Sequence, residues 1–147
     1  MRLFTACLLC MMGALFAQSS DEKDAVAAVQ KVFDATAAHD ATAIRAMMLP
    51  NAQLQSVRDN AAPSARPAEE FASQIAAAKG DLLERFTGQP NVLVRGRIAQ
   101  VWGEYEFLRD GKLSHCDIDT ASLFKTPDGW KIASLAFTME TTGCKGQ

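Results

Sequence analysis

Two Asp-Gly pairs, Asp110-Gly111 and Asp128-Gly129, separate long apolar-rich runs in the second half of this chain. An Asp-Gly pair between alternating runs is a strong hairpin signal, because both central residues of a type I′ turn adopt positive φ. We treat each pair as a two-residue loop. Counting outward from the loop along both strands then gives the positions that face each other. The sequence therefore predicts an antiparallel meander over residues 92–142.

Helix signals occupy the part of the chain before this meander. Ser19 and Glu22 form a capping-box pair, and the apolar residues that follow have the spacing of one helix face. Asp40 suits the N-cap of a short second helix, which must end before Pro50 because proline disfavours a helical residue ahead of it. Pro67 suits the first turn of a third helix. We expect helices over residues 19–39, 40–48 and 67–80, with a short strand at 53–57 and a loop at 60–67.

Five further runs predict strands, at residues 82–86, 91–95, 98–108, 112–125 and 130–142. Three of them exceed the usual length of ~5 to 6 residues, and long antiparallel strands must twist and bend. Gly103, in the middle of one, is a candidate bulge or bend. The order of elements predicts an α+β fold, in which three N-terminal helices pack on one face of a curved antiparallel sheet.

The N-terminal segment has the pattern of a secretory signal peptide. An apolar run over residues 3–16 is too short to span a bilayer and is followed at once by polar residues. We expect a signal peptide over residues 1–17 and a single exported domain over residues 18–147, in the periplasm or outside the cell. A lipoprotein, lipidated at Cys7 or Cys10, is the alternative.

Charge excludes some classes of partner. The whole chain carries 15 Lys and Arg against 17 Asp and Glu, and loss of Arg2 with the signal peptide makes the mature net charge −3. Such a chain has no basic stripe for nucleic acid or for an anionic membrane surface. We therefore expect neither partner, and no membrane association once the signal peptide is removed.

Two cysteines, Cys116 and Cys144, remain in the mature chain, in a compartment where disulfides persist. Counting outward from the second Asp-Gly pair places Cys116 opposite Thr141, three residues before Cys144. A bulge or a strand bend could absorb this offset. We favour a disulfide; two unlinked small apolar residues are the alternative.

Three segments carry a family resemblance: residues 102–107 (WGEYEF), 110–116 (DGKLSHC) and 128–132 (DGWKI). Together with the order of elements, they resemble the nuclear transport factor 2-like (NTF2-like) superfamily, and within it the SnoaL-like or lumazine-binding-like group. The resemblance implies a cone-shaped fold around one pocket, and commonly a homodimer through the outer sheet face. The superfamily includes ketosteroid isomerase, scytalone dehydratase and polyketide cyclases as well as binding domains, so the fold does not choose a function.

The chain departs from the pattern of that close group. A glycine usually follows the His-Cys pair there, and an arginine-rich segment precedes the final cysteine. Here Asp117 follows Cys116, and residues 137–142 contain no arginine. The ligand specificity of the group therefore does not transfer directly.

Counting outward from Asp110-Gly111 predicts which side chains share a sheet face. We expect three cross-strand pairs on one face: His115 with Glu106, Asp117 with Glu104, and Asp119 with Trp102. The other, more apolar face would carry Val101, Tyr105, Phe107, Ile118 and Phe124. A bulge at Gly103 would exchange the two faces beyond it.

Three residues are candidates for chemistry. His115 beside Glu106 could form a general acid-base pair. Asp119 beside Trp102 would be desolvated, which raises the pKa of a carboxyl group. Tyr105, the single tyrosine, could orient a carbonyl ligand. The plain alternatives are a surface pair for His115, a solvent-facing Asp119 and a core Tyr105.

Glu104, Asp117 and Glu140 could converge on a hard cation. Three carboxylates without a spacing signature are more typical of a solvated face, so we expect no metal site and no cofactor.

Two functions from different classes fit these observations. The first is a non-catalytic domain that holds a small apolar or aromatic ligand, with candidate pocket residues Trp102, Tyr105, Phe107, Asp119 and Phe137. The second is a small isomerase, lyase or cyclase, in which Asp119 or His115 shuttles a proton and Tyr105 stabilises the oxyanion. A buried carboxylate with a raised pKa inside a sizeable pocket would favour the enzyme. A third possibility is that side chains fill the cavity and that the outer face of the sheet serves only to form a dimer.

Overall fold

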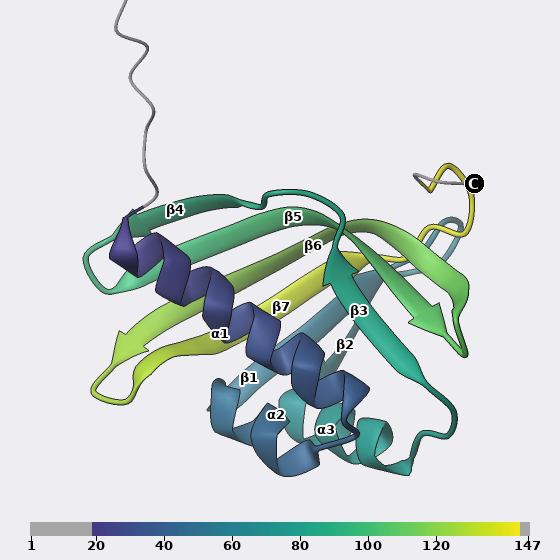
Figure 1. Ribbon diagram of the computed structural model, residues 1–147, viewed down its shortest axis with the longest axis horizontal. Coiled ribbons are helices and arrows are strands. Elements are labelled where there is room, and N and C mark those ends of the chain that lie inside the picture. Colours follow the sequence, from purple (N-terminus) through teal and green to yellow (C-terminus); the bar gives the residue numbers. More distant parts are fainter. Residues whose placement is uncertain (1–18, 145–147) are drawn as a thin grey trace, which may run out of the picture.

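The computed structural model describes residues 19–144; the expected signal peptide over residues 1–17 lies outside this range. Three helices cover one face of a seven-stranded sheet (Figure 1). The helices are α1 (Ser20–Ala37), α2 (Ala41–Met47) and α3 (Ala68–Ala77). The strands are β1 (Met48–Val57), β2 (Ser64–Pro67), β3 (Leu82–Phe86), β4 (Asn91–Arg95), β5 (Ile98–Arg109), β6 (Lys112–Thr126) and β7 (Gly129–Thr138). No helix in this range is long and apolar enough to cross a membrane.

The predicted helix starts are confirmed by their caps. The Ser19 hydroxyl accepts a hydrogen bond from the Glu22 amide (3.2 Å), and the Glu22 carboxylate accepts one from the Ser19 amide (2.7 Å). Asp40 caps α2 by accepting from the Ala43 amide at 2.9 Å. These bonds satisfy amide donors that a helix cannot pair internally.

The sheet is mixed, with the strand order β2-β1-β7-β6-β5-β3 and β4 paired to β5. The expectation of a purely antiparallel sheet is therefore wrong, because β1 runs parallel to β7. The three helices are not all N-terminal to the sheet either, since β1 and β2 lie between α2 and α3. Residues 64–67, expected in a loop, form β2 because their backbone pairs with the edge of β1; an edge strand tolerates Pro67.

The two hairpins differ in how well their turns were predicted. Across the first, Arg109 pairs with Lys112, and Asp110 (φ 51°) and Gly111 (φ 71°) form the expected two-residue loop. The second prediction is wrong by one residue, because the loop is residues 127–128 and Gly129 (φ 97°) already pairs with Thr126. Proline early in a turn and glycine at its end favour this arrangement.

A bulge in β6 changes which face the later residues of β6 occupy. Leu108 pairs with Leu113 but Phe107 pairs with His115, which leaves Ser114 as an extra residue. The three predicted cross-strand pairs are therefore wrong: the partners are His115 with Phe107, Asp117 with Tyr105, and Asp119 with Gly103. An exchange of faces, considered for a bulge at Gly103, thus occurs at Ser114 instead.

Gly103 is needed for space. A Cβ atom at this position would lie 2.6 Å from the Phe86 ring and 3.0 Å from the Pro90 Cβ. Its absence lets Phe86 lie against β5 and contact Phe33 of α1, with ring centroids 5.1 Å apart. This contact joins the edge of the sheet to α1.

The predicted disulfide between Cys116 and Cys144 is present, with Cα atoms 5.8 Å apart. Cys116 pairs with Glu140 through two backbone hydrogen bonds, not with Thr141, because the loop lies one residue earlier than expected and β7 has one extra residue between Ile132 and Ser134. The bridge holds the segment after β7 against β6.

Candidate functional site

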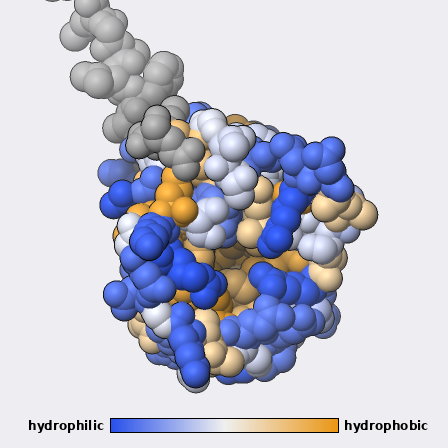
Figure 2. Space-filling model, turned by 90° about the vertical axis from the view of Figure 1, so that its right-hand side faces the viewer, coloured by the Kyte–Doolittle hydropathy of each residue, from blue (hydrophilic) through white to orange (hydrophobic). Residues whose placement is uncertain are grey.

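A cavity of about 460 Å³ lies between the helices and the concave face of the sheet. Figure 2 shows a hollowed face with hydrophobic residues at the bottom and hydrophilic residues around the rim. Its apolar wall includes Val32 of α1, Leu54 of β1, Phe71 of α3, Phe107 of β5, and Leu135 and Phe137 of β7. Its polar lining includes Arg58, Arg66, Glu70, Glu84, Arg109 and His115.

Two carboxyl groups lie at this face of the sheet. Glu84 of β3 lines the cavity, and Asp119 of β6 lies in the core with 1% of its surface exposed. Neither Asp119 oxygen has a hydrogen-bond partner in the described part of the chain. Burial raises the pKa of Asp119 to about 7, although the nearby Thr120 amide favours the charged form. Burial, and then the charge of Asp119, raise the pKa of Glu84 well above its ordinary value. At neutral pH this pair therefore holds at least one proton.

Tyr105 lies beside the acid pair. Burial, and then the charges of Glu84 and Asp119, raise the pKa of its hydroxyl. The hydroxyl donates a hydrogen bond to the Thr138 carbonyl at 2.6 Å. The hydroxyl proton of Tyr105 is therefore already used in a hydrogen bond to the backbone of β7, and this bond holds the end of β7 to β5.

His115 occupies the wall of the cavity as a neutral side chain. Its ring stacks on Phe107 with centroids 4.9 Å apart and an angle of 17° between planes, and its Nδ1 lies 3.1 Å from the Ser114 hydroxyl. Burial first, and then the charges of Arg58 and Arg109, lower the pKa of His115 to about 4. An imidazole with this pKa is a hydrogen-bonding group at neutral pH rather than a cation.

Several solved structures share this arrangement. A protein of the NTF2-like superfamily from Salmonella enterica superposes with a TM-score of 0.68 at 13% identity, over 89% of this chain and 99% of its own. A proposed dehydratase of the NTF2-like family from Streptomyces avermitilis gives 0.66 at 19% identity, over 82% and 96%. This chain has the NTF2-like fold.

A third neighbour in shape, a proposed aromatic ring hydroxylase from Novosphingobium aromaticivorans, gives a TM-score of 0.67 at 15% identity, over 81% of this chain and 88% of its own. No protein-family model and no curated protein sequence matches the chain. At these identities the likeness concerns the fold alone, since solved structures with such different names share it.

The NTF2-like sheet places the predicted pocket residues at three depths. Phe107 and Phe137 line the cavity, whereas Tyr105 and Asp119 lie buried beside it in the core. Trp102 lies on the outer face with 51% of its surface exposed, so it does not line the cavity. The difference follows from the bulge at Ser114, which moves Asp119 to the face opposite Trp102.

The predicted pair of His115 and Glu106 does not form. Glu106 lies on the outer side of the sheet, where its carboxylate accepts a hydrogen bond from Arg85 at 2.6 Å. His115 has an aromatic ring beside it instead of a carboxylate, so no acidic partner fixes its tautomer.

Sequence reasoning missed Glu84. A signal for it existed, because Leu82, Glu84 and Phe86 alternate with the exposed Leu83 and Arg85, and the period of a strand places the acid on the face of Leu82 and Phe86. An acid on the apolar face of a strand is a candidate for a pocket group.

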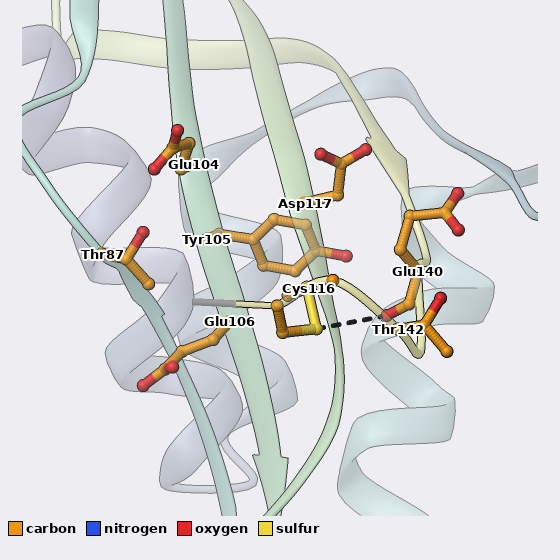
Figure 3. A pocket seen from close by; sticks show the side chains of 10 residues that line it. Thr87, Glu104, Tyr105, Glu106, Cys116, Asp117, Glu140 and Thr142 are labelled. Carbon is orange, nitrogen blue, oxygen red and sulfur yellow. Dashed lines mark hydrogen bonds between the residues drawn. A yellow bond between two sulfur atoms is a disulfide. The ribbon is translucent and has the colours of Figure 1, made fainter. Parts of the chain in front are cut away.

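A second, smaller pocket of about 130 Å³ adjoins the disulfide and gathers acidic residues (Figure 3). It is lined by Glu104, Asp117 and Glu140, the three carboxylates considered as cation ligands. Their side chains point in different directions in Figure 3, and residues 19–144 contain no group of three His, Cys, Asp or Glu side chains placed to hold a metal ion. Asp117 instead accepts a hydrogen bond from the Thr138 hydroxyl at 2.6 Å.

Proposed function

We propose that this protein binds a small, largely apolar or aromatic molecule in the cavity above β5, β6 and β7. The observation that carries the proposal is a cavity of about 460 Å³ with aromatic residues in its wall and charged and polar residues around them. Ligand sites typically have volumes of roughly 300 to 1,000 Å³ and this kind of lining. Phe71, Phe107 and Phe137 would contact the body of the ligand.

We further propose that binding occurs in an exported, single-domain protein of residues 18–147. Support comes from the signal-peptide pattern of residues 1–17 and from the disulfide between Cys116 and Cys144, which persists in an oxidising compartment. Periplasmic and extracellular destinations are both compatible with this support.

Native mass spectrometry of protein purified from an exporting host tests the binding proposal. Ala78, at the end of α3, lines the cavity, whereas its neighbour Ala77 is exposed and does not. We expect Ala78→Phe to fill part of the cavity and to lose a co-purified small molecule, while the matched control Ala77→Phe retains it. Equal retention by both variants would place the ligand elsewhere.

The acid pair favours a second candidate function. Glu84 and Asp119 hold at least one proton at neutral pH next to an apolar cavity, which is the environment of a general acid or base. The protein would then be a small isomerase, lyase or cyclase, with this pair moving the proton. Tyr105 is less suited to an oxyanion role because its hydroxyl donates to Thr138.

Binding and turnover separate the two candidates. For an enzyme, Glu84→Gln should retain the ligand but reduce turnover of that ligand by roughly 10²-fold or more, the scale of general acid-base catalysis. A binding protein would show no turnover in either form. The substrate to use is the molecule released in the mass-spectrometry experiment.

We also propose a homodimer through the outer sheet face. Leu93, Ile98, Trp102 and Phe124 are exposed there by 74%, 46%, 51% and 44%. Adjacent exposed apolar side chains are typical of an interface. We expect light scattering to give a dimer mass that Trp102→Glu reduces to that of a monomer, whereas Leu83→Glu, at the edge strand β3, does not. A wild-type monomer at high micromolar concentration would refute the dimer.

A further inference from the structure

We propose that the ligand of this cavity is an organic anion, whose acidic group binds Arg58 and Arg109 at the cavity mouth while its apolar body lies against Phe107 and Phe137. The inference rests on the proposed binding function and names the class of ligand. A carboxylate is the group expected, because its two oxygens match the paired N–H donors of a guanidinium.

Arginines from three separate elements meet at this cavity. Arg58 follows β1, Arg66 lies on β2, and Arg109 ends β5. The chain as a whole has a net charge of −2, so its composition alone does not supply three guanidinium groups to one cavity. Their convergence creates a positive mouth on an acidic protein.

These arginines are largely without acidic partners. In the described part of the chain Arg45 and Arg85 form salt bridges, but none of the three cavity arginines does. The Arg58 Nε contacts the Met139 sulfur at 3.2 Å, and the Arg109 guanidinium makes no hydrogen bond within residues 19–144. Each guanidinium has five N–H donors, so both can bind an incoming anion.

Arg66 contributes less. It donates to the Gln74 side chain and lies 5.3 Å over the Phe71 ring, and the charge of Glu70, which lines the same cavity, acts on it. We therefore assign the anion to Arg58 and Arg109.

The acid pair beside the cavity carries at most one negative charge at neutral pH, against the positive charges of Arg58 and Arg109. Burial first, and then the charges of Arg58 and Arg109, lower the pKa of His115, so that this side chain of the wall is neutral. Glu84 and Asp119 together hold at least one proton at neutral pH, and a protonated carboxyl group can donate a hydrogen bond to the far end of the ligand. The ligand class is thus a compact organic acid with an apolar or aromatic body.

Matched acids and amides test the inference. Isothermal titration of the disulfide-bonded protein from an exporting host would compare benzoate with benzamide and 2-naphthoate with 2-naphthamide, which differ in charge but hardly in shape. We expect the acids to bind at least about tenfold more tightly, the scale of hydrogen bonds to a charged group. Raising the salt concentration should weaken the binding of the acids and leave the binding of the amides unchanged.

Arginine variants locate the anion. Arg58→Gln and Arg109→Gln should each weaken the binding of 2-naphthoate by about five- to tenfold, without changing the affinity for 2-naphthamide. Arg109→Lys keeps the charge and should retain part of the affinity. Arg95→Gln, an equal charge change at an exposed position of β4 outside the cavity, should change neither.

The outcomes distinguish this inference from the proposed function. Equal binding of acids and amides, or equal losses for both probes in the arginine variants, would overturn the anionic ligand and leave cavity binding standing. Failure of every acid and amide to bind at millimolar concentration would overturn both.

Discussion

Replacing Asp119 by asparagine should remove most of the pH dependence of stability in the neutral range. The pKa of Asp119 rises from its ordinary value of 3.8 to about 7 because the carboxyl group is buried and unpaired. Between these two values the folded protein keeps a proton that the unfolded chain has released. Stability therefore falls as the pH rises through this window, and the loss is complete above about pH 7.

The size of this loss follows from the shift. About three pKa units at about 1.4 kcal/mol each correspond to about 4 kcal/mol for an isolated group. Because Glu84 and Asp119 titrate as a pair, we expect the free energy of unfolding of the wild type to fall by about 2 to 4 kcal/mol between pH 4.5 and pH 8.5. This fall should be absent from Asp119→Asn. The buried asparagine amide lowers the free energy of unfolding by a similar amount at every pH, so the change with pH, and not the value at one pH, reports the titration of Asp119.

Urea unfolding of wild type, Asp119→Asn and the control Asp128→Asn at pH 4.5, 7 and 8.5 measures the effect. Asp128 lies in the exposed turn before β7, so its variant should follow the wild-type profile. Stability profiles of wild type and Asp119→Asn that run parallel across this range would refute the reasoning, because Asp119 would then titrate alike in the folded and unfolded states.

Two further predictions concern the frame of the site. Gly103→Ala should lower the free energy of unfolding by about 1 to 3 kcal/mol in denaturant, because its Cβ would overlap Phe86 and approach Pro90; an unchanged midpoint would show that the ring moves freely. Cys144→Ser opens a disulfide that spans 28 positions, and should cost about 3 to 4 kcal/mol in the same assay. If the reduced wild-type protein loses the same stability as Cys144→Ser, the disulfide is the source of the loss. A loss of stability below about 0.5 kcal/mol in Cys144→Ser would contradict the prediction.

Local sequence signals predicted the elements well. The capping box at Ser19, the N-cap at Asp40 and the turn at Asp110-Gly111 lie within about 1 residue of their expected places, since such signals act through neighbouring backbone groups. The strands β3 and β4 have their predicted bounds. The disulfide was also within reach, because only two cysteines remain after the expected signal peptide.

The site depended on information that local signals do not carry. One extra residue at Ser114 moves Asp119 and His115 to the concave face, because the side-chain period of a strand is two. Nothing in the sequence around Ser114 distinguishes a bulge from a regular ladder, so Asp119 was expected on the same face as Trp102.

Neighbouring residues were thus enough to predict the α+β class, the helix caps and the first hairpin, and a count of the cysteines was enough to favour their pairing. The parallel pairing of β1 with β7, and the cavity in which Glu84, Arg58 and Arg109 meet, depend on contacts between distant parts of the chain. These residues lie on separate strands or beyond their ends, and they come together only because the sheet curves under the helices. Burial then changes their chemistry, since a carboxyl group removed from water holds its proton at a pH where an exposed one has lost it.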